Sequence, residues 1–397
     1  MTFDPAKATA AYIDALGPEA LAKAANYTAG SHWLLFWGLV VSAVVTWGVV
    51  RSGVLDRIAA RLANRGWALR TWLVCAAFLL INAIVTLPWS IYEEWHRETS
   101  YGRTSQPLFD FLMQDGIGIA LTTVFGALFF LGVYALIRRT GRRWWLWSGG
   151  LAALSISALL LLSPIIIEPL FNSYKPLPAG PVRTALVAQA AEAGIPADRI
   201  FVYDGSRQSN NFTANVSGVL GSARIAISDV ALGKASLDEV RAVTGHEIGH
   251  YVLGHIWRSV IVFSLLAIIL FFLADRLFPR IARLFGSKAD IGDPTGFPVL
   301  LFTIGLFGLL AVPVTNGVTR LGESEADDYS YRTVDLPDAM AAALVKTAEY
   351  RNPRPTAAQE FLFYTHPSVE RRVRTAMDWK AAHPQVPAPV PAPVPAK

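Results

Sequence analysis

Six long apolar runs set the pattern of this chain, and each is long enough to cross a lipid bilayer as a helix. They lie at about 32–50, 71–91, 115–137, 145–167, 258–278 and 297–317. A transmembrane helix needs roughly 20 mainly apolar residues to span the hydrocarbon core. Tryptophans fall near several ends of these runs, as is typical of the membrane–water interface. One such run could be a buried helix of a soluble protein, but six predict an integral, multi-pass membrane protein.

The polar stretches between and after these runs predict a second, smaller domain. Residues 169–257 have the composition of a soluble protein, with a helix expected over 181–194 and short strands over 199–203, 212–217 and 224–228. We therefore expect a mainly α-helical fold, in which a transmembrane bundle of about six spans carries a small α+β domain. The expected parts are a four-span membrane domain at 1–168, a soluble part at 169–257, a transmembrane hairpin at 258–317, a C-terminal soluble part at 318–383 and a proline-rich disordered tail at 384–397.

The composition agrees with this division and excludes several classes of protein. Hydrophobic residues make up 53% of the chain and charged residues only 16%, so the lipid bilayer is an expected partner. The single cysteine, Cys75, lies in an apolar run, which excludes a disulfide framework and a cysteine-based metal site. The net charge of +5 comes from basic residues in short loops beside the apolar runs, which does not indicate a nucleic-acid partner.

A pentad of the pattern H-E-x-x-H begins at His246 and ends at His250. On a helix these two histidines lie on one face, so both rings can reach the same zinc ion. Glu247 lies close enough to take a proton from a water on that zinc. Ser236 and Glu239 have the spacing of a capping box, which predicts that a helix starts ten residues before the pentad. Two histidines on a solvated helix face are the structural alternative.

A zinc site of this kind needs a third protein ligand. His255 lies nine positions after His246, on roughly the opposite side of a continuous helix, so we expect it at the membrane interface. Glu323 and Asp327 are four residues apart and share a helix face. This spacing suits Glu323 as the ligand and Asp327 as a partner of a zinc-binding histidine. Glu325 points elsewhere on that helix. Two histidines and one glutamate leave a fourth position for water, which is the catalytic arrangement of Zn²⁺, with one ion per chain.

Together these residues resemble the type I CAAX prenyl endopeptidases, the multi-span zinc peptidases related to the yeast a-factor converting enzyme. The resemblance covers about residues 20–380 and rests on motifs in a matching order. These are Leu87-Pro-Trp-Ser90, Glu168-Pro-Leu-Phe171, Lys175-Pro-Leu-Pro178, Asp204-Gly-Ser206, the pentad at His246, Glu323-x-x-Ala326-Asp327, and His366-Pro367 with Arg372.

The resemblance implies a peptidase whose helical bundle encloses a chamber capped by a zincin-like domain. It implies that His246, His250 and Glu323 bind zinc and that Glu247 is the catalytic base and acid. It also implies that His366 and Arg372 lie near the scissile carbonyl, where donors and cations stabilise a developing oxyanion.

The chain departs from the family pattern at the strand that would bind substrate. The family has an active-site asparagine where this chain has Thr213, and Asn215 follows two residues later, on the same side of a strand. We expect an exposed edge strand around 213–217 that pairs with an extended substrate, and either residue remains a candidate for the substrate contact. The chain also lacks the additional first span of the eukaryotic members.

Two arguments from the sequence place the zinc domain on opposite sides of the membrane. Basic residues follow the first, third and fifth apolar runs, and the positive-inside rule would place those loops in the cytoplasm and the zinc domain outside. The resemblance implies a cytoplasmic zinc domain, which we adopt as the expectation from sequence. The Ala- and Arg-rich character of the chain suggests a bacterial inner membrane.

We therefore expect a zinc metalloendopeptidase, acting on peptide or protein substrates. One substrate class is the prenylated C-terminus of CAAX proteins, and an equally weighted one is membrane or misfolded polypeptides. A transporter or scaffold with an incidental pentad is the alternative. A transporter would carry ionisable or broken positions within its spans, whereas these runs are largely free of charge.

Overall fold

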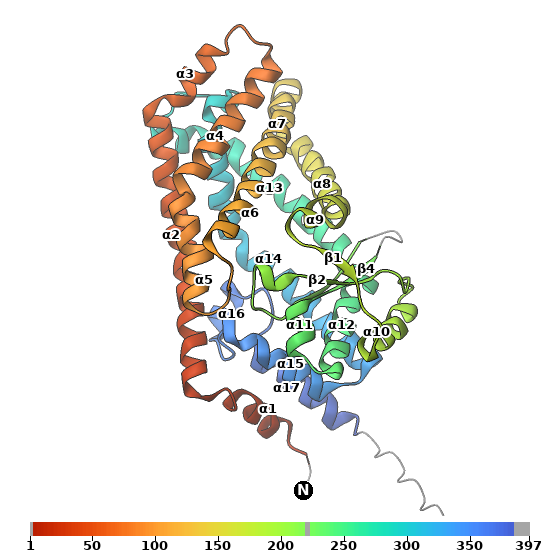
Figure 1. Cartoon of the computed structure of the whole chain (residues 1–397). Coiled ribbons are helices and arrows are strands. Elements are labelled where there is room, and N and C mark those ends of the chain that lie inside the picture. Colours follow the sequence, from red (N-terminus) through yellow and green to blue (C-terminus); the bar gives the residue numbers. More distant parts are fainter. Residues whose placement is uncertain (1–2, 219–222, 385–397) are drawn as a thin grey trace, which may run out of the picture.

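The computed structural model describes residues 3–218 and 223–384. A long helical bundle occupies one end of the molecule and a mixed α/β domain the other (Figure 1). This is the fold class expected from the sequence. Residues 385–397, nearly all of the expected proline-rich tail, lie outside the described part.

Five helical stretches in the described part are long and apolar enough to cross a membrane. They are Gly17–Ser52, Trp67–Ser100, Leu108–Phe171, His255–Phe285 and Pro294–Val334. The third reverses direction at Gly141, where φ is 52°, so its two halves pack side by side as α7 (Ala127–Thr140) and α8 (Trp144–Leu162). This stretch therefore holds two of the six expected runs.

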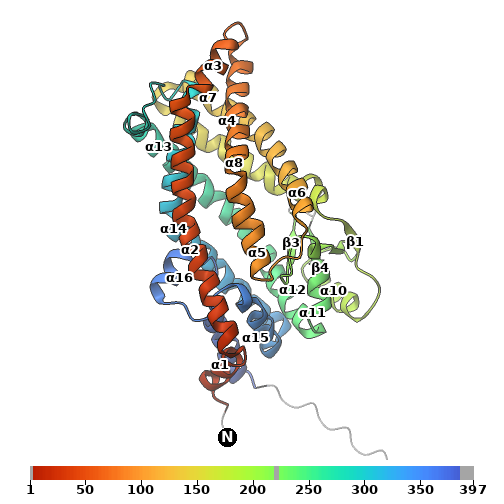
Figure 2. The same ribbon diagram turned by 60° about the vertical axis from the view of Figure 1, so that its left-hand side comes forward.

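The N-terminal membrane domain is built from long helices joined by short turns (Figure 2). Its helices are α1 (Pro5–Asp14), α2 (Gly17–Ser52), α3 (Val54–Arg61), α4 (Trp67–Ser90), α5 (Arg97–Ser100), α6 (Leu108–Leu121), α7, α8 and α9 (Glu168–Phe171). Single π-helical turns at Ile91–His96, Thr122–Gly126 and Ser163–Ile167 continue α4, α6 and α8. All three turns lie within or at the end of expected apolar runs, and hydropathy does not distinguish a π-helical turn from an α-helical one.

The mixed domain contains a four-stranded sheet in the order β1-β2-β4-β3. Its strands are β1 (Tyr174–Pro176), β2 (Ile200–Tyr203), β3 (Ala214–Ser217) and β4 (Arg224–Ser228). Strands β2 and β4 are parallel, and the outer pairs are antiparallel. The last three strands match the predicted ones, whereas β1 was not predicted because its three residues are too short for an alternating pattern. Among the described residues β3 is an edge strand, as expected.

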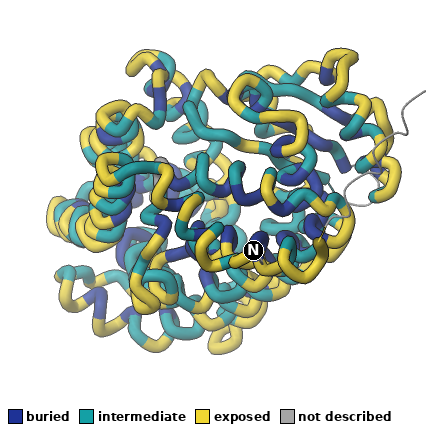
Figure 3. The backbone as a smooth tube through the Cα atoms, turned by 90° about the horizontal axis from the view of Figure 1, so that it is seen from below, coloured by how far each residue is buried: buried dark blue, intermediate teal, exposed yellow. Residues whose placement is uncertain are grey.

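Six helices complete the domain around the sheet and beyond the membrane hairpin. Helices α10 (Pro181–Glu192), α11 (Asp229–Lys234) and α12 (Leu237–Val252) surround the sheet, and Leu186, Ile225 and Ile248 are among the buried side chains of their shared core. Helices α15 (Pro337–Lys346), α16 (Ala357–Phe363) and α17 (Val369–Ala382) follow the membrane hairpin. Figure 3 views the molecule from this end: many buried residues lie towards the middle of the view, and many exposed residues lie at its rim.

The membrane hairpin consists of α13 (His255–Phe285) and α14 (Phe297–Val334). Helix α14 runs without a break from the bundle into the mixed domain, where it packs along α12. Gly245 and Gly249 make this close packing of the two helices sterically feasible. A Cβ atom at Gly249 would lie 3.2 Å from the backbone of Ala326, and one at Gly245 would lie 2.4 Å from the side chain of Val334. The two glycines therefore let the pentad helix approach the helix that carries Glu323.

Candidate metal centre and peptidase site

The start of helix α12 is fixed by the capping box that the sequence predicts. The Ser236 N–H donates to the Glu239 carboxylate at 2.6 Å, and the Glu239 N–H donates to the Ser236 hydroxyl at 3.3 Å. Lys346 of α15 adds an ion pair to the same carboxylate at 2.8 Å. Because the first turn is fixed in this way, the register of the pentad along α12 is fixed as well.

The structure brings His246, His250 and Glu323 together at the contact between α12 and α14. One ligand atom of each lies within 4.8 Å of the others. The Nε2 atoms of the two histidines are 3.1 Å apart, and they lie 3.3 and 3.4 Å from the Glu323 carboxylate oxygens. The Oε2 atom of Glu323 is buried without a hydrogen-bond partner. Two imidazole nitrogens and a carboxylate oxygen converging in this way fit a divalent metal such as zinc.

A buried carboxylate orients the first of these histidines. Asp327 Oδ1 lies 2.8 Å from His246 Nδ1, so this nitrogen donates its proton and Nε2 is left for a metal. Arg372 of α17 donates two hydrogen bonds to Asp327, at 2.7 and 2.6 Å. Arg372 also lies 3.8 Å from Glu323 Oε2. The family resemblance implies that Arg372 lies near the scissile carbonyl. In the structure Arg372 borders the same cleft as Glu247, and its main contact is with Asp327, behind His246.

His366 lies beside Glu323, in the loop between α16 and α17. Its Nε2 atom is 3.3 Å from Glu323 Oε2. Arg320 of α14 holds this loop, because its guanidinium donates to the backbone carbonyls of Glu360 and Tyr364, at 2.9 and 2.5 Å. Burial lowers the pKa of His366 to about 3, so the ring is neutral near pH 7 and can act as a hydrogen-bond donor.

A cleft beside the sheet opens onto the three candidate metal ligands. Glu247, His246, Glu323, His366 and Arg372 border it together with Thr213 and Ala214 of the β3 segment, and Phe212, Val243, Met340 and Leu344 give it an apolar wall. Burial raises the pKa of the Glu247 carboxyl above its ordinary value, against the opposing effect of the nearby His246 and His250 rings. This favours a glutamate that can hold a proton and release it again.

The two candidate residues on the strand expected to bind substrate have different surroundings. Thr213 borders the cleft, and its hydroxyl lies 2.8 Å from the Tyr203 hydroxyl. Asn215 pairs with Ala226 across the sheet, and its amide oxygen is buried without a hydrogen-bond partner. Thr213 is therefore closer to the reacting groups, while Asn215 has the unused hydrogen-bonding capacity.

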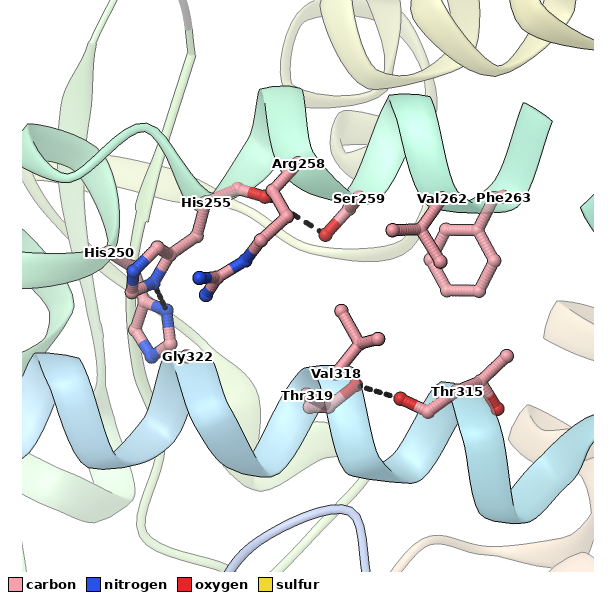
Figure 4. A pocket seen from close by; sticks show the side chains of 10 residues that line it. All are labelled: His250, His255, Arg258, Ser259, Val262, Phe263, Thr315, Val318, Thr319 and Gly322. Atoms are coloured by element: carbon pink, nitrogen blue, oxygen red, sulfur yellow. Dashed lines mark hydrogen bonds between the residues drawn. The ribbon is translucent and has the colours of Figure 1, made fainter. Parts of the chain in front are cut away.

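The expectation that His255 lies on the far side of the pentad helix from His246 was wrong. Gly254 adopts a left-handed conformation, with φ of 66°, and separates α12 from α13, so the helical angle counted from His246 does not extend to position 255. His255 turns back towards the site, and its Nδ1 lies 2.8 Å from His250 Nδ1 (Figure 4). A glycine after the pentad was the sequence signal for this break.

His255 belongs to a polar chain that the sequence did not predict. Its Nε2 lies 2.9 Å from Glu325 Oε2, and Arg258 binds the same carboxylate oxygen at 2.8 Å. If His250 Nε2 faces the metal, His250 donates from Nδ1 to His255 Nδ1, and the other nitrogen of His255 lies beside the Glu325 carboxylate. Glu325 points away from His246, as expected. Through His255 it nevertheless helps to fix the orientation of the His250 ring. Figure 4 shows Arg258 reaching into the pocket between α13 and α14.

Comparison with known proteins identifies the family. The model of peptidase family M48 matches residues 176–380, and the model of the CAAX prenyl protease N-terminal region, described as five membrane helices, matches residues 5–173. The chain belongs to peptidase family M48. It is therefore a membrane-embedded metallopeptidase, and not the transporter or scaffold considered as the alternative.

Relatives of this M48 chain occur in bacteria and eukaryotes. The uncharacterized metalloprotease YhfN of Bacillus subtilis is 28% identical over 372 residues, which are 90% of this chain and 86% of that protein. CAAX prenyl protease 1 of Saccharomyces cerevisiae is 30% identical and covers 55% of this chain and 52% of its own length. The crystal structure of S. mikatae Ste24p superimposes with a TM-score of 0.74, covering 94% of this chain and 95% of that one at 21% identity, which shows a shared fold.

Proposed function

We propose that this M48 protein is a zinc endopeptidase whose single Zn²⁺ is held by His246, His250 and Glu323. The observation that carries this proposal is the convergence of the three ligand atoms within 4.8 Å of one another, beside Glu247 in one cleft. Asp327 and His255 orient the two imidazoles from behind, as partners of metal-binding histidines commonly do.

The other polar groups of the cleft supply the remaining steps of peptide hydrolysis. When bound, zinc would lower the pKa of a water molecule and polarise the scissile carbonyl. Glu247 accepts the proton of the attacking water and returns it to the leaving amine. His366 donates a hydrogen bond from its neutral ring to the carbonyl oxygen as negative charge develops there. Arg372 keeps Asp327 ionised and in place, and its positive charge is 3.8 Å from Glu323.

The substrate would bind as an extended strand along β3. An edge strand offers free backbone groups, which hold a peptide straight without requiring a particular sequence. Thr213 and Ala214 place this edge beside Glu247 and the metal ligands. Asn215 would contribute its unpaired amide oxygen to a backbone N–H of the substrate.

The substrates we propose are membrane-associated polypeptides, with two classes in view. Several relatives are named CAAX prenyl protease 1, which supports prenylated C-termini. The bacterial relative YhfN is named only as a metalloprotease, and a bacterium need not prenylate CAAX proteins, so cleavage of membrane or misfolded proteins has equal support. We propose the inner membrane of a bacterium as the location.

Hydrolysis by the purified protein tests this function. The full chain in detergent is incubated with unstructured peptides, and the products are identified by mass spectrometry. We expect internal cleavage that stops with a chelator and returns on addition of Zn²⁺. Cleavage that continues at an unchanged rate in a fully metal-depleted sample would contradict the proposal.

A further inference from the structure

The three basic loops of the membrane domain meet at one end of the bundle, opposite the metal centre. These loops, residues 51–70, 138–143 and 275–295, are called the basic end here. Gly286 packs against the side chain of Arg51, and the Arg138 guanidinium carbon lies 4.4 Å from the centre of the Trp67 ring. The 31-residue helix α13 starts at His255, beside the metal ligands, and reaches the basic end about 46 Å away.

The basic end carries a large excess of positive charge. Its three loops contain 13 Arg and Lys residues and 4 Asp residues. Twelve of the 13 basic side chains are exposed. One ion pair with an acidic side chain is found among the described residues of this end, between Arg276 and Asp275 at 3.8 Å. These positive charges are therefore available to bind a negatively charged surface outside the chain.

The short connection on the side of the metal centre has the opposite balance. Residues 92–110, which join α4 to α6, contain two arginines and four acidic residues. Both arginines are already engaged, because Arg97 and Arg103 pair with Glu98 at 3.4 and 2.6 Å and lie over the Tyr27 ring. Within this short connection both basic side chains are therefore neutralised, in contrast to the exposed arginines of the basic end.

We propose that the basic end lies in the cytoplasm against the anionic headgroups of the inner leaflet, and that the metal centre faces outward. Arginine and lysine in short loops set the orientation of a bundle, whereas long segments such as residues 169–257 are translocated largely regardless of charge. Anionic lipids are concentrated in the cytoplasmic leaflet and attract basic residues near its surface. This orientation is the reverse of the one implied by the family resemblance.

The outward orientation narrows the substrate class, if the proposed peptidase function holds. The substrates would be secreted polypeptides and the extracytoplasmic segments of membrane proteins. A prenylated C-terminus on the cytoplasmic side would not reach the site, so cleavage of membrane or misfolded proteins becomes the main role.

Cysteine labelling of the full chain in a bacterial host tests the orientation without using activity. Asn64→Cys marks the basic end, and Ala197→Cys marks an exposed loop of the mixed domain. The wild type is the blank, because Cys75 is fully buried. With a membrane-impermeant maleimide on intact spheroplasts, we expect labelling at position 197 and at position 64 only after lysis. Labelling at 64 but not at 197 in intact spheroplasts, or equal labelling at both, would overturn the proposal.

A membrane-impermeant fluorogenic peptide separates the orientation from the peptidase function. We expect intact spheroplasts with the wild type to hydrolyse it, and those with Glu247→Gln not to. Hydrolysis that occurs only after lysis would refute the outward orientation while leaving the peptidase function intact. Absence of hydrolysis in detergent as well would contradict the proposed function, and the labelling result would still decide the orientation.

Discussion

Arg372 binds Asp327 through two hydrogen bonds, of 2.7 Å from Nε to Oδ2 and 2.6 Å from Nη2 to Oδ1. The two side chains come from α17 and α14, and both are buried, with 8% and 2% exposure. The Oδ1 atom of Asp327 is also the partner of His246 Nδ1. The C-terminal helix therefore fixes the orientation of a proposed metal ligand that lies 126 residues earlier in the chain.

Arg372→Met should weaken both zinc binding and folding. The variant leaves Asp327 buried without its cation, which costs about 3–5 kcal/mol in the free energy of unfolding. Loss of the partner that orients a ligand lowers metal affinity roughly 10–100-fold. Chelator competition and thermal unfolding measure the two effects. Arg374→Met, two residues away and in a surface ion pair with Asp378, is the control. Equal zinc affinity in both variants would remove the positioning role from Arg372.

His255→Ala should lower zinc affinity about 10-fold, because His250 would lose the group that orients its ring. Glu325→Ala should also lower the zinc affinity, but by a smaller factor, because Glu325 contacts His250 only through His255. Asp328→Ala, on the same helix and paired with Arg332 at the surface, should leave the affinity unchanged. Chelator competition on the three purified variants gives the comparison, and an unchanged affinity in His255→Ala would show that the ring contact is incidental.

Much of this site follows from spacing along helices, and the rest depends on tertiary packing. The i, i+4 spacing within each helix predicted that His246 and His250 share one face and that Glu323 and Asp327 share another. The two faces meet because Gly245 and Gly249 allow α12 and α14 to approach each other closely. No local sequence pattern predicts this approach.

The misplacement of His255 had a local cause, whereas the contact between Arg372 and Asp327 depends on residues far apart in the chain. The misplacement came from extending a helical period across Gly254, which ends the helix. The Arg372–Asp327 contact joins residues 45 positions apart and requires α17 to fold back over α14, so no local pattern predicts it. The spans were predicted well because roughly 20 apolar residues are a strong signal, whereas the three-residue strand β1 carries almost none.

Gly249→Ala tests the close packing of the two metal-binding helices. The new methyl group would lie 3.2 Å from the Ala326 backbone and 3.1 Å from the Tyr329 Cβ, so the helices must separate. We expect a loss of about 1–3 kcal/mol in the free energy of unfolding, together with weaker zinc binding. Gly233→Ala is the matched control, because a helical Cβ there meets nothing within 4 Å. Equal stability of the two variants, measured by thermal unfolding, would argue against a packing role for Gly249.

The pH dependence of hydrolysis should report Glu247 and not His366. Burial raises the pKa of Glu247 above 4.5, and only its ionised form can accept a proton. Activity should therefore fall on the acid side with a midpoint above 4.5. His366, whose pKa is lowered to about 3, stays neutral over this range. The profile of kcat/KM against pH for the wild type and His366→Gln provides the check. A limb near pH 6.5 that disappears in His366→Gln would show that this ring titrates during catalysis.

The central claim is that one zinc is held by His246, His250 and Glu323 and that Glu247 performs the proton transfer. Zinc content by elemental analysis, measured beside peptide hydrolysis on the same samples, tests it most directly. We predict one zinc per chain in the wild type and in Glu247→Gln, hydrolysis lowered about 10²–10⁴-fold in Glu247→Gln, and neither zinc nor hydrolysis in His246→Ala. An active wild-type sample without zinc, or near wild-type hydrolysis by Glu247→Gln, would contradict the claim.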